Sequence, residues 1–95
     1  MIYFIVDVRI GRPKNKKVFY KGEEDTCSYF GWYINEETKL SYELAYNEIC
    51  KAIECYNKTK RPVYVSMNYH KYEKFSIEYL LCWKKDYEQR LNNYK

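Results

Sequence analysis

The sequence predicts a small α+β domain over residues 1–95, with an antiparallel sheet of about four to five strands packed on one central amphipathic helix. Alternating apolar and polar residues, typical of half-buried strands, flank one long segment whose apolar residues recur with helical spacing. Gly and Pro number only three and two, and 20% of the residues are aromatic, which excludes a disordered chain. The predicted chain order is strand, strand, strand, helix, strand, strand, with room for a short C-terminal helix.

The first strand is predicted over residues 2–10. Its even residues are apolar, whereas Asp7 and Arg9 stand among the odd residues, so one face can be buried and the other exposed. The turn-forming, basic segment 11–16 and the β-prone run 17–21 follow. Together they predict a β-hairpin with a positively charged tip.

Residues 22–25 predict an acidic loop, and residues 27–34 predict a third strand because aromatic side chains dominate that run. From Ser41 the apolar period changes from two to about 3.6, which predicts a helix. Ser41 is expected to cap this helix, with Leu40 and Ala45 forming a hydrophobic staple. The apolar face of the predicted helix comprises Tyr42, Ala45, Tyr46, Ile49, Ala52, Ile53 and Tyr56.

Residues 62–69 alternate again and predict a fourth strand that begins at Pro62, where no interior ladder bond is lost. Two patterns compete in the residues that follow. Alternation favours a fifth strand from Phe75 to about Trp83, followed by a short helix opened by Asp86. The alternative is a helix whose seam consists of Leu80, Trp83, Tyr87, Leu91 and Tyr94.

The net charge of +4 is distributed in blocks along the chain. Residues 1–22 and 55–95 are basic and residues 23–54 are acidic, so the folded surface can carry separate positive and negative regions. The apolar run at the start of the chain is too short for a signal peptide or a transmembrane helix. We therefore expect no membrane partner and a location in the cytoplasm of a bacterial host. The four cysteines are expected to be free, mostly buried thiols.

Catalytic patterns are weak in this sequence. Cys55 and Arg61 have the Cys-x5-Arg spacing of tyrosine-phosphatase loops, but no glycine lies between them and the cysteine falls near the end of the predicted helix. His70 is the sole histidine, and its predicted place is a surface turn. No set of residues has zinc-ligand spacing. We expect a protein that is not an enzyme and that uses no cofactor or metal.

Binding is indicated instead by the thirteen tyrosines, which exceed what the predicted core can hold. Tyrosine offers a large, stiff contact area with a hydroxyl for specificity. Tyrosines on a sheet face with basic residues would also stack on single-stranded nucleic acid and neutralise its phosphates. The predicted partner-binding residues are Arg9, Arg12, Lys14, Lys16, Lys17, Tyr20, Lys21, Tyr64 and Tyr72.

In size, and in usage rich in Lys, Asn, Tyr and Ile, the chain resembles small proteins of AT-rich bacteria and their phages, among them anti-CRISPR proteins. The resemblance is compositional, rests on no motif and transfers no site residue. It implies an inhibitor that occludes a host or defence protein or a ribonucleoprotein complex through a Tyr-rich, charge-segregated surface. The alternative is direct nucleic-acid binding by the basic N-terminal hairpin. Strand edges and aromatic faces also leave room for a homodimer.

Overall fold

The computed structural model describes residues 4–11, 19–20, 23–24, 28–34 and 38–94. Most of the predicted basic hairpin lies outside these ranges, as does Cys27. The predicted binding residues outside them are Arg12, Lys14, Lys16, Lys17 and Lys21.

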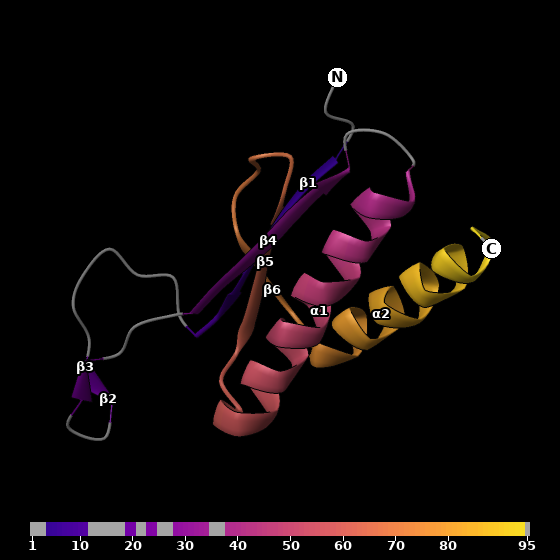
Figure 1. Cartoon of the computed structure of the whole chain (residues 1–95). Coiled ribbons are helices and arrows are strands. Elements are labelled where there is room, and N and C mark those ends of the chain that lie inside the picture. Colours follow the sequence, from indigo (N-terminus) through magenta and orange to yellow (C-terminus); the bar gives the residue numbers. More distant parts are fainter. Residues whose placement is uncertain (1–3, 12–18, 21–22, 25–27, 35–37, 95) are drawn as a thin grey trace.

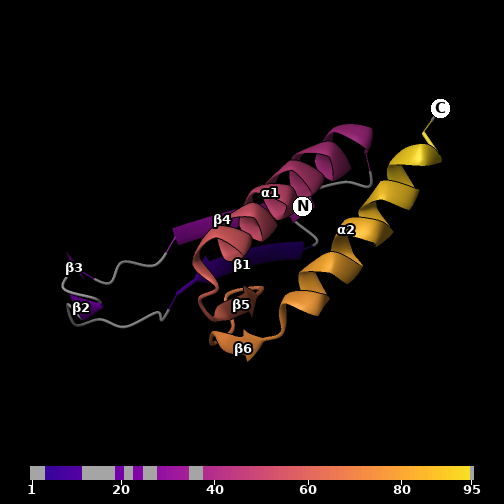
Figure 2. The ribbon, with the colours of Figure 1, turned by 90° about the horizontal axis from the view of Figure 1, so that it is seen from below.

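An open antiparallel sheet and two helices form the body of the protein (Figure 1). The strands, in their order across the sheet, are β4 (Ser28–Ile34), β1 (Phe4–Ile10), β5 (Val63–Met67) and β6 (Glu73–Phe75). The helices α1 (Lys39–Thr59) and α2 (Ile77–Asn92) both lie on one face of this sheet (Figure 2). The predicted α+β class is confirmed, although two helices cover the sheet where the sequence predicted one central helix.

The predicted alternation of the first strand is confirmed, because Val6, Val8 and Ile10 are at most 1% exposed and point toward the helices. β1 is an inner strand of the sheet, with β4 on one side and β5 on the other, and α1 covers its apolar face. Burying several aliphatic side chains in this way stabilises the fold by about 2 kcal/mol each. The other buried members of the core are Trp32, Ile34, Tyr42, Ala45, Ile49, Ala52, Ile53, Val63, Val65, Leu80 and Tyr87.

The predicted helix begins earlier than expected. Thr38, and not Ser41, caps α1, because the Thr38 side-chain oxygen accepts a hydrogen bond from the backbone N–H of Ser41 at 3.2 Å. Leu40 is 63% exposed, so the predicted staple does not form. The apolar face itself is confirmed: five of its seven members are buried, and the other two, Tyr46 and Tyr56, pack against the core as partly buried residues.

The predicted strand from Phe75 to Trp83 is wrong beyond its first residue, and the alternative helical seam is correct. β6 ends at Phe75 and α2 follows at once, capped by Ser76, whose hydroxyl accepts from the Glu78 N–H at 3.2 Å. In a strand Leu80 and Trp83 would point to opposite faces. The helix directs both toward the core, with Leu80 fully buried, and this burial decides between the two patterns.

The predicted hairpin between the first two strands does not form in the sheet, since β1 pairs with β4 on one side and β5 on the other. β2 (Phe19–Tyr20) pairs instead with β3 (Glu23–Glu24), where the sequence predicted an acidic loop. These two short strands make a separate ribbon away from the main sheet (Figure 1). β4 lies beside β1, and its residues Trp32 and Ile34 are buried on the helix side of the sheet.

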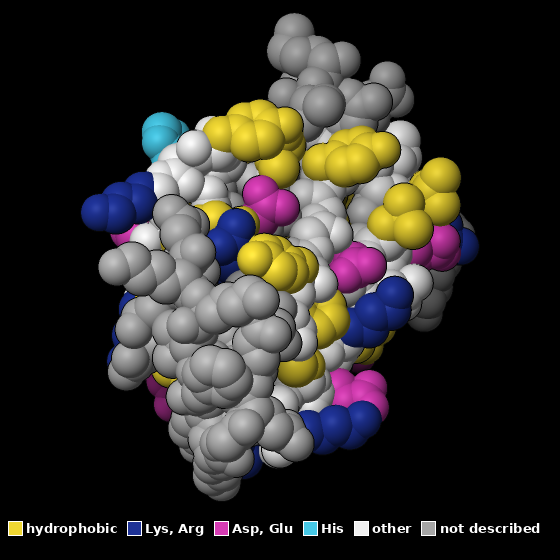
Figure 3. All heavy atoms as spheres, turned by 90° about the vertical axis from the view of Figure 1, so that its left-hand side faces the viewer, with side chains coloured by type: hydrophobic (Ala, Val, Ile, Leu, Met, Phe, Trp, Pro, Cys, Tyr) yellow, Lys and Arg dark blue, Asp and Glu magenta, His cyan; other side chains and the backbone are white. Residues whose placement is uncertain are grey.

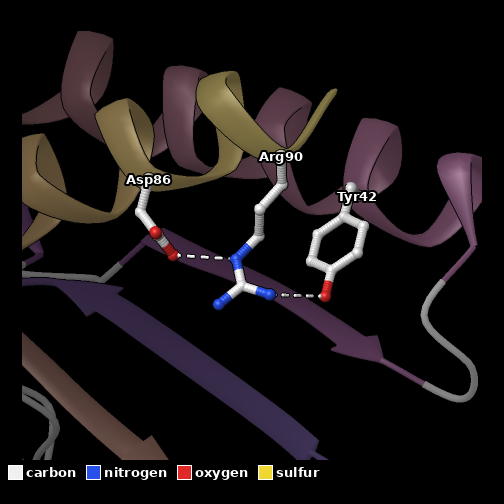
Figure 4. Close-up of polar contacts among 3 residues, drawn as sticks. All are labelled: Tyr42, Asp86 and Arg90. Atoms are coloured by element: carbon white, nitrogen blue, oxygen red, sulfur yellow. Dashed lines mark hydrogen bonds and ion pairs between the residues drawn. The ribbon is translucent and has the colours of Figure 1, made fainter. Parts of the chain in front are cut away.

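A polar clasp joins the two helices (Figure 4). The Arg90 guanidinium on α2 donates from Nη1 to the Tyr42 hydroxyl at 3.0 Å and from Nε to an Asp86 carboxylate oxygen at 3.2 Å. The hydrogen bond to Tyr42 is the main reason why the pKa of Arg90 is raised above its ordinary value. The clasp fixes α2 against α1. Because both helices lie on one side of the sheet, neither of them covers the opposite face.

Candidate binding face of the sheet

The face of the sheet turned away from the helices is the candidate functional site. Figure 3 looks onto this side of the molecule, where hydrophobic side chains gather with a few acidic and basic ones between them. Side chains alternate along each strand, so residues paired across strands share a face. The register places on this face Ile5, Asp7 and Arg9 of β1, Tyr29, Gly31 and Tyr33 of β4, Tyr64 and Ser66 of β5, and Lys74 of β6.

One row across this face consists of Tyr29, Arg9, Tyr64 and Lys74, and we call it the Tyr-Arg row. Arg9 pairs with Tyr29 on one side and Tyr64 on the other, and Tyr64 pairs with Lys74. Tyr29 is 63% exposed, Tyr64 is half-buried and Lys74 is exposed. Each of the four main strands therefore contributes one aromatic or cationic side chain to a continuous line.

Arg9 is held in the middle of this row by aromatic rings. Its guanidinium carbon lies 4.6 Å from the centre of the Tyr29 ring and 4.0 Å from the centre of the Tyr72 ring. Such cation-π contacts contribute about 0.5–2 kcal/mol each, more as water is excluded. Within the described residues the Arg9 Nε is buried and has no hydrogen-bond partner. Among the described residues, the rings of Tyr29 and Tyr72 thus position this cation.

The neighbouring row consists of Gly31, Asp7 and Ser66, and Tyr72, from the segment before β6, contacts Arg9 of the Tyr-Arg row. Gly31 is exposed, and a Cβ there would lie only 3.1 Å from an Asp7 carboxylate oxygen, so a larger residue would crowd the acid. Ser66 is buried, and its hydroxyl donates to the His70 carbonyl oxygen, which fixes the turn that carries Tyr72. This row has the smaller side chains of the face, and Asp7 is the one acidic group on the face among the described residues.

The described residues of this face carry a small net positive charge. Arg9 and Lys74 are positive and Asp7 is negative, whereas the aromatic groups are Tyr29, Tyr33, Tyr64 and Tyr72. Tyr and Arg are the residue types enriched at the centres of protein interfaces, and clustered charge is depleted there. The face therefore has the composition of an interface centre, with hydroxyls and one acid available for hydrogen bonding.

Three of the predicted binding residues, Arg9, Tyr64 and Tyr72, are brought together on this face. Five of the others lie outside the described residues, and the structure describes the strand of Tyr20 but not its side chain. The prediction missed Lys74, because it fell in the segment whose strand and helix patterns competed. It also missed Tyr29 as a site residue, although Tyr29 lies within the predicted third strand. The cross-strand register, which no local pattern reveals, is what aligns both with Arg9.

Of the two residues considered for catalysis, Cys55 lies on the helix side of the sheet, whereas His70 lies at the border of this face, beside Ser66 (Figure 3). Cys55 is half-buried within α1, at the C-terminal part of the helix as predicted, and His70 lies exposed in the turn after β5. Cys50, Cys55 and Cys82 are free, as expected, but Cys82 is exposed and the other two are only half-buried, so the predicted burial is wrong. Among the described residues, no group of three or more His, Cys, Asp or Glu side chains could hold a metal ion.

The fold and this face define a small α+β protein with an open, tyrosine-rich antiparallel sheet. No helix in the described part of the chain is long and apolar enough to cross a membrane. In comparisons with protein-family models, curated proteins and solved structures, the chain matches none of them.

Proposed function

We propose that this protein is a non-enzymatic binding module whose open sheet face contacts a larger protein or ribonucleoprotein complex and blocks it. The observation that supports the proposal is the Tyr-Arg row, in which the Arg9 cation on β1 lies between Tyr29 of β4 and Tyr64 of β5, with Lys74 of β6 beyond them. Tyr and Arg side chains carry much of the binding free energy in protein interfaces. The row is rigid as well, because its backbone belongs to a hydrogen-bonded sheet.

The composition of the face favours a protein surface as the principal contact. Asp7 lies beside Arg9 on the same strand and would repel a phosphate chain that crossed the middle of the sheet. A protein partner can instead place a donor against Asp7 and an apolar group against the tyrosines. The compositional resemblance to small phage proteins supports an inhibitor of a host or defence complex, acting in the bacterial cytoplasm.

The first experiment is affinity purification with the intact chain as bait in an extract of its native host. We expect one dominant macromolecular partner, enriched over an unrelated bait of similar size and charge. An eluate without such a partner would count against the proposal that the protein is an inhibitor.

Direct binding of single-stranded nucleic acid is the second candidate, and the observation that favours it is the alternation of aromatic and cationic groups along the Tyr-Arg row. Bases stack on tyrosine and phosphates pair with Arg9, Lys74 and the basic residues of the 12–18 segment. The association constant can be measured by fluorescence anisotropy. Its logarithm should fall linearly with the logarithm of the salt concentration, with a slope of about −0.7 per neutralised phosphate. Changing Lys14, Lys16 and Lys17 together to Glu should abolish it, and a wild-type chain that retains no oligonucleotide at low salt excludes this candidate.

A further inference from the structure

Among the described strands, β4 forms an outer edge of the main sheet, and it lacks the features that usually prevent an edge strand from pairing with other chains. β4 is seven residues long and contains no charged residue and no proline. Natural edge strands are commonly protected by Lys, Pro, bulges or short length. The opposite edge of the sheet shows that protection, since β6 has three residues, two of which are Glu73 and Lys74.

The direction of the backbone groups of β4 follows from β1. The Ile5 N–H donates to the Asn68 side chain and the Ile5 carbonyl accepts from the Asn68 N–H, so the odd residues of β1 point toward β5. The even residues of β1 therefore bond to the even residues of β4, their partners in the register. The N–H and C=O groups of Gly31 and Tyr33 then point outward along the edge.

From these observations we infer that two copies of this chain pair through β4, antiparallel and with a two-fold axis at Gly31, to form one continuous sheet. Gly31 is the central residue of β4, so this pairing joins its outward N–H and C=O to the same groups of the second copy. It also places Tyr33 of one copy beside Tyr29 of the other. Both rings are more than half exposed in the single chain, at 58% and 63%.

The helix layer beside β4 is compatible with the same two-fold axis. A cleft of about 390 Å³ runs along the edge between β4 and α1, and its helix wall includes Leu44, Glu48 and Lys51. Leu44 is 53% exposed there. Glu48 and Lys51 form an ion pair, so this wall has no net charge from the two residues. Two copies that meet here would therefore not repel each other through them. A second copy of the chain would therefore cover apolar groups on both faces of this edge. It would also bond to the outward N–H and C=O groups in the plane of the sheet.

The test is the molecular mass in solution, measured by size-exclusion chromatography with light scattering over a wide range of protein concentration. The wild-type chain should approach twice the 11.8 kDa of one chain as its concentration rises. The double variant Tyr29→Lys with Tyr33→Lys should stay at the mass of one chain, because like charges then lie directly opposite across the axis. A wild-type chain that stays monomeric at the highest concentration, or a double variant that still dimerises, overturns the inference.

A charge swap tests the register itself. In Tyr29→Glu with Tyr33→Lys, each new carboxylate lies opposite a new ammonium group of the second copy, so the dimer should return. The matched control, Tyr69→Lys with Tyr79→Lys, changes two exposed tyrosines away from the edge and should dimerise like the wild type. A swap variant that folds, by circular dichroism, but stays monomeric rejects the axis at Gly31.

Hydrogen exchange of the unmodified chain gives a readout that does not depend on how well the variants fold. The amides of Gly31 and Tyr33 should exchange at least about tenfold more slowly in concentrated than in dilute samples. Equal rates in both samples overturn the inference. None of these measurements includes a partner molecule. A negative result would therefore reject the dimer and not the proposed function, and failure to capture a partner would reject the proposed function and not the dimer.

Discussion

Individual hydroxyl groups determine where the helices begin. Thr38 and Ser41 are both good capping residues, and the sequence favours Ser41 because the apolar period starts beside it. In the structure the Ser41 N–H is already bonded to the Thr38 side chain, and the Thr38 hydroxyl donates in turn to the Ser41 hydroxyl at 3.0 Å. Ser41 alone was expected as the cap, because the position of a helix boundary is set by the tertiary structure and local periodicity gives it only to within a few residues.

Thr38→Ala should lower the free energy of unfolding by about 1 kcal/mol, because it leaves a helix N–H without its acceptor. Ser41→Ala should cost clearly less, since its own N–H keeps the Thr38 acceptor. Urea unfolding followed by circular dichroism measures both. If Ser41→Ala proves the more damaging of the two, Thr38 is not the cap.

A second residue-scale property is the pH dependence set by Tyr46 on α1. Partial burial, the Cys50 thiol and the Glu88 carboxylate raise the pKa of Tyr46 to about 12. The Tyr46 hydroxyl donates to Glu88 on α2 at 3.2 Å, so it bridges the two helices only while protonated. Burial likewise raises the pKa of Tyr87.

Because the folded chain holds the Tyr46 proton more tightly than the unfolded chain, the free energy of unfolding should fall as pH rises from about 10 to 12. Below pH 10 this contribution is fully present. Urea unfolding at several alkaline pH values should show the decline, and Tyr46→Phe should make it shallower, with Tyr87 supplying part of the remainder. An unchanged slope in Tyr46→Phe would contradict this assignment.

At the scale of whole elements, regular periods predicted well and competing periods did not. β1 and α1 each show one clear pattern, and both were predicted with nearly correct limits. After Tyr72 the residues satisfy both a strand and a helix pattern, and only the packing resolves them. Trp83 lies 5.7 Å, centre to centre, from Trp32 on β4 in an edge-to-face contact, and that tertiary contact cannot be read from local periodicity.

Two adjacent leucines distinguish the helix from the strand. Leu80 is fully buried, whereas Leu81 is 47% exposed. Leu80→Ala should therefore destabilise the protein by about 2–5 kcal/mol, and Leu81→Ala by well under that amount. A strand with Phe75, Leu81 and Trp83 on its buried face would give the reverse order, so unfolding of the two variants side by side decides the matter.

At the scale of the whole molecule, the proposed function depends on placing both helices on one face. The tyrosine surplus was predicted from the composition, Arg9 and Tyr64 because alternation assigns a side chain to one of two faces, and Tyr72 because its predicted turn left it open to contact. The alignment of Tyr29 and Lys74 with Arg9 was not predicted, since it depends on the strand order β4, β1, β5, β6. That order pairs β1 with segments far along the chain, and no local rule fixes such a register.

Binding by two matched variants in the native extract tests whether the open sheet face is the binding surface. Tyr64→Ser with Lys74→Ser removes two members of the Tyr-Arg row away from the β4 edge, and Tyr79→Ser with Lys85→Ser removes the same residue types from α2. We expect the first variant to lose at least about tenfold in partner capture, equivalent to about 1.4 kcal/mol, while the second binds like the wild type. Equal capture by the first variant and the wild type would contradict the assignment of the open sheet face as the binding surface.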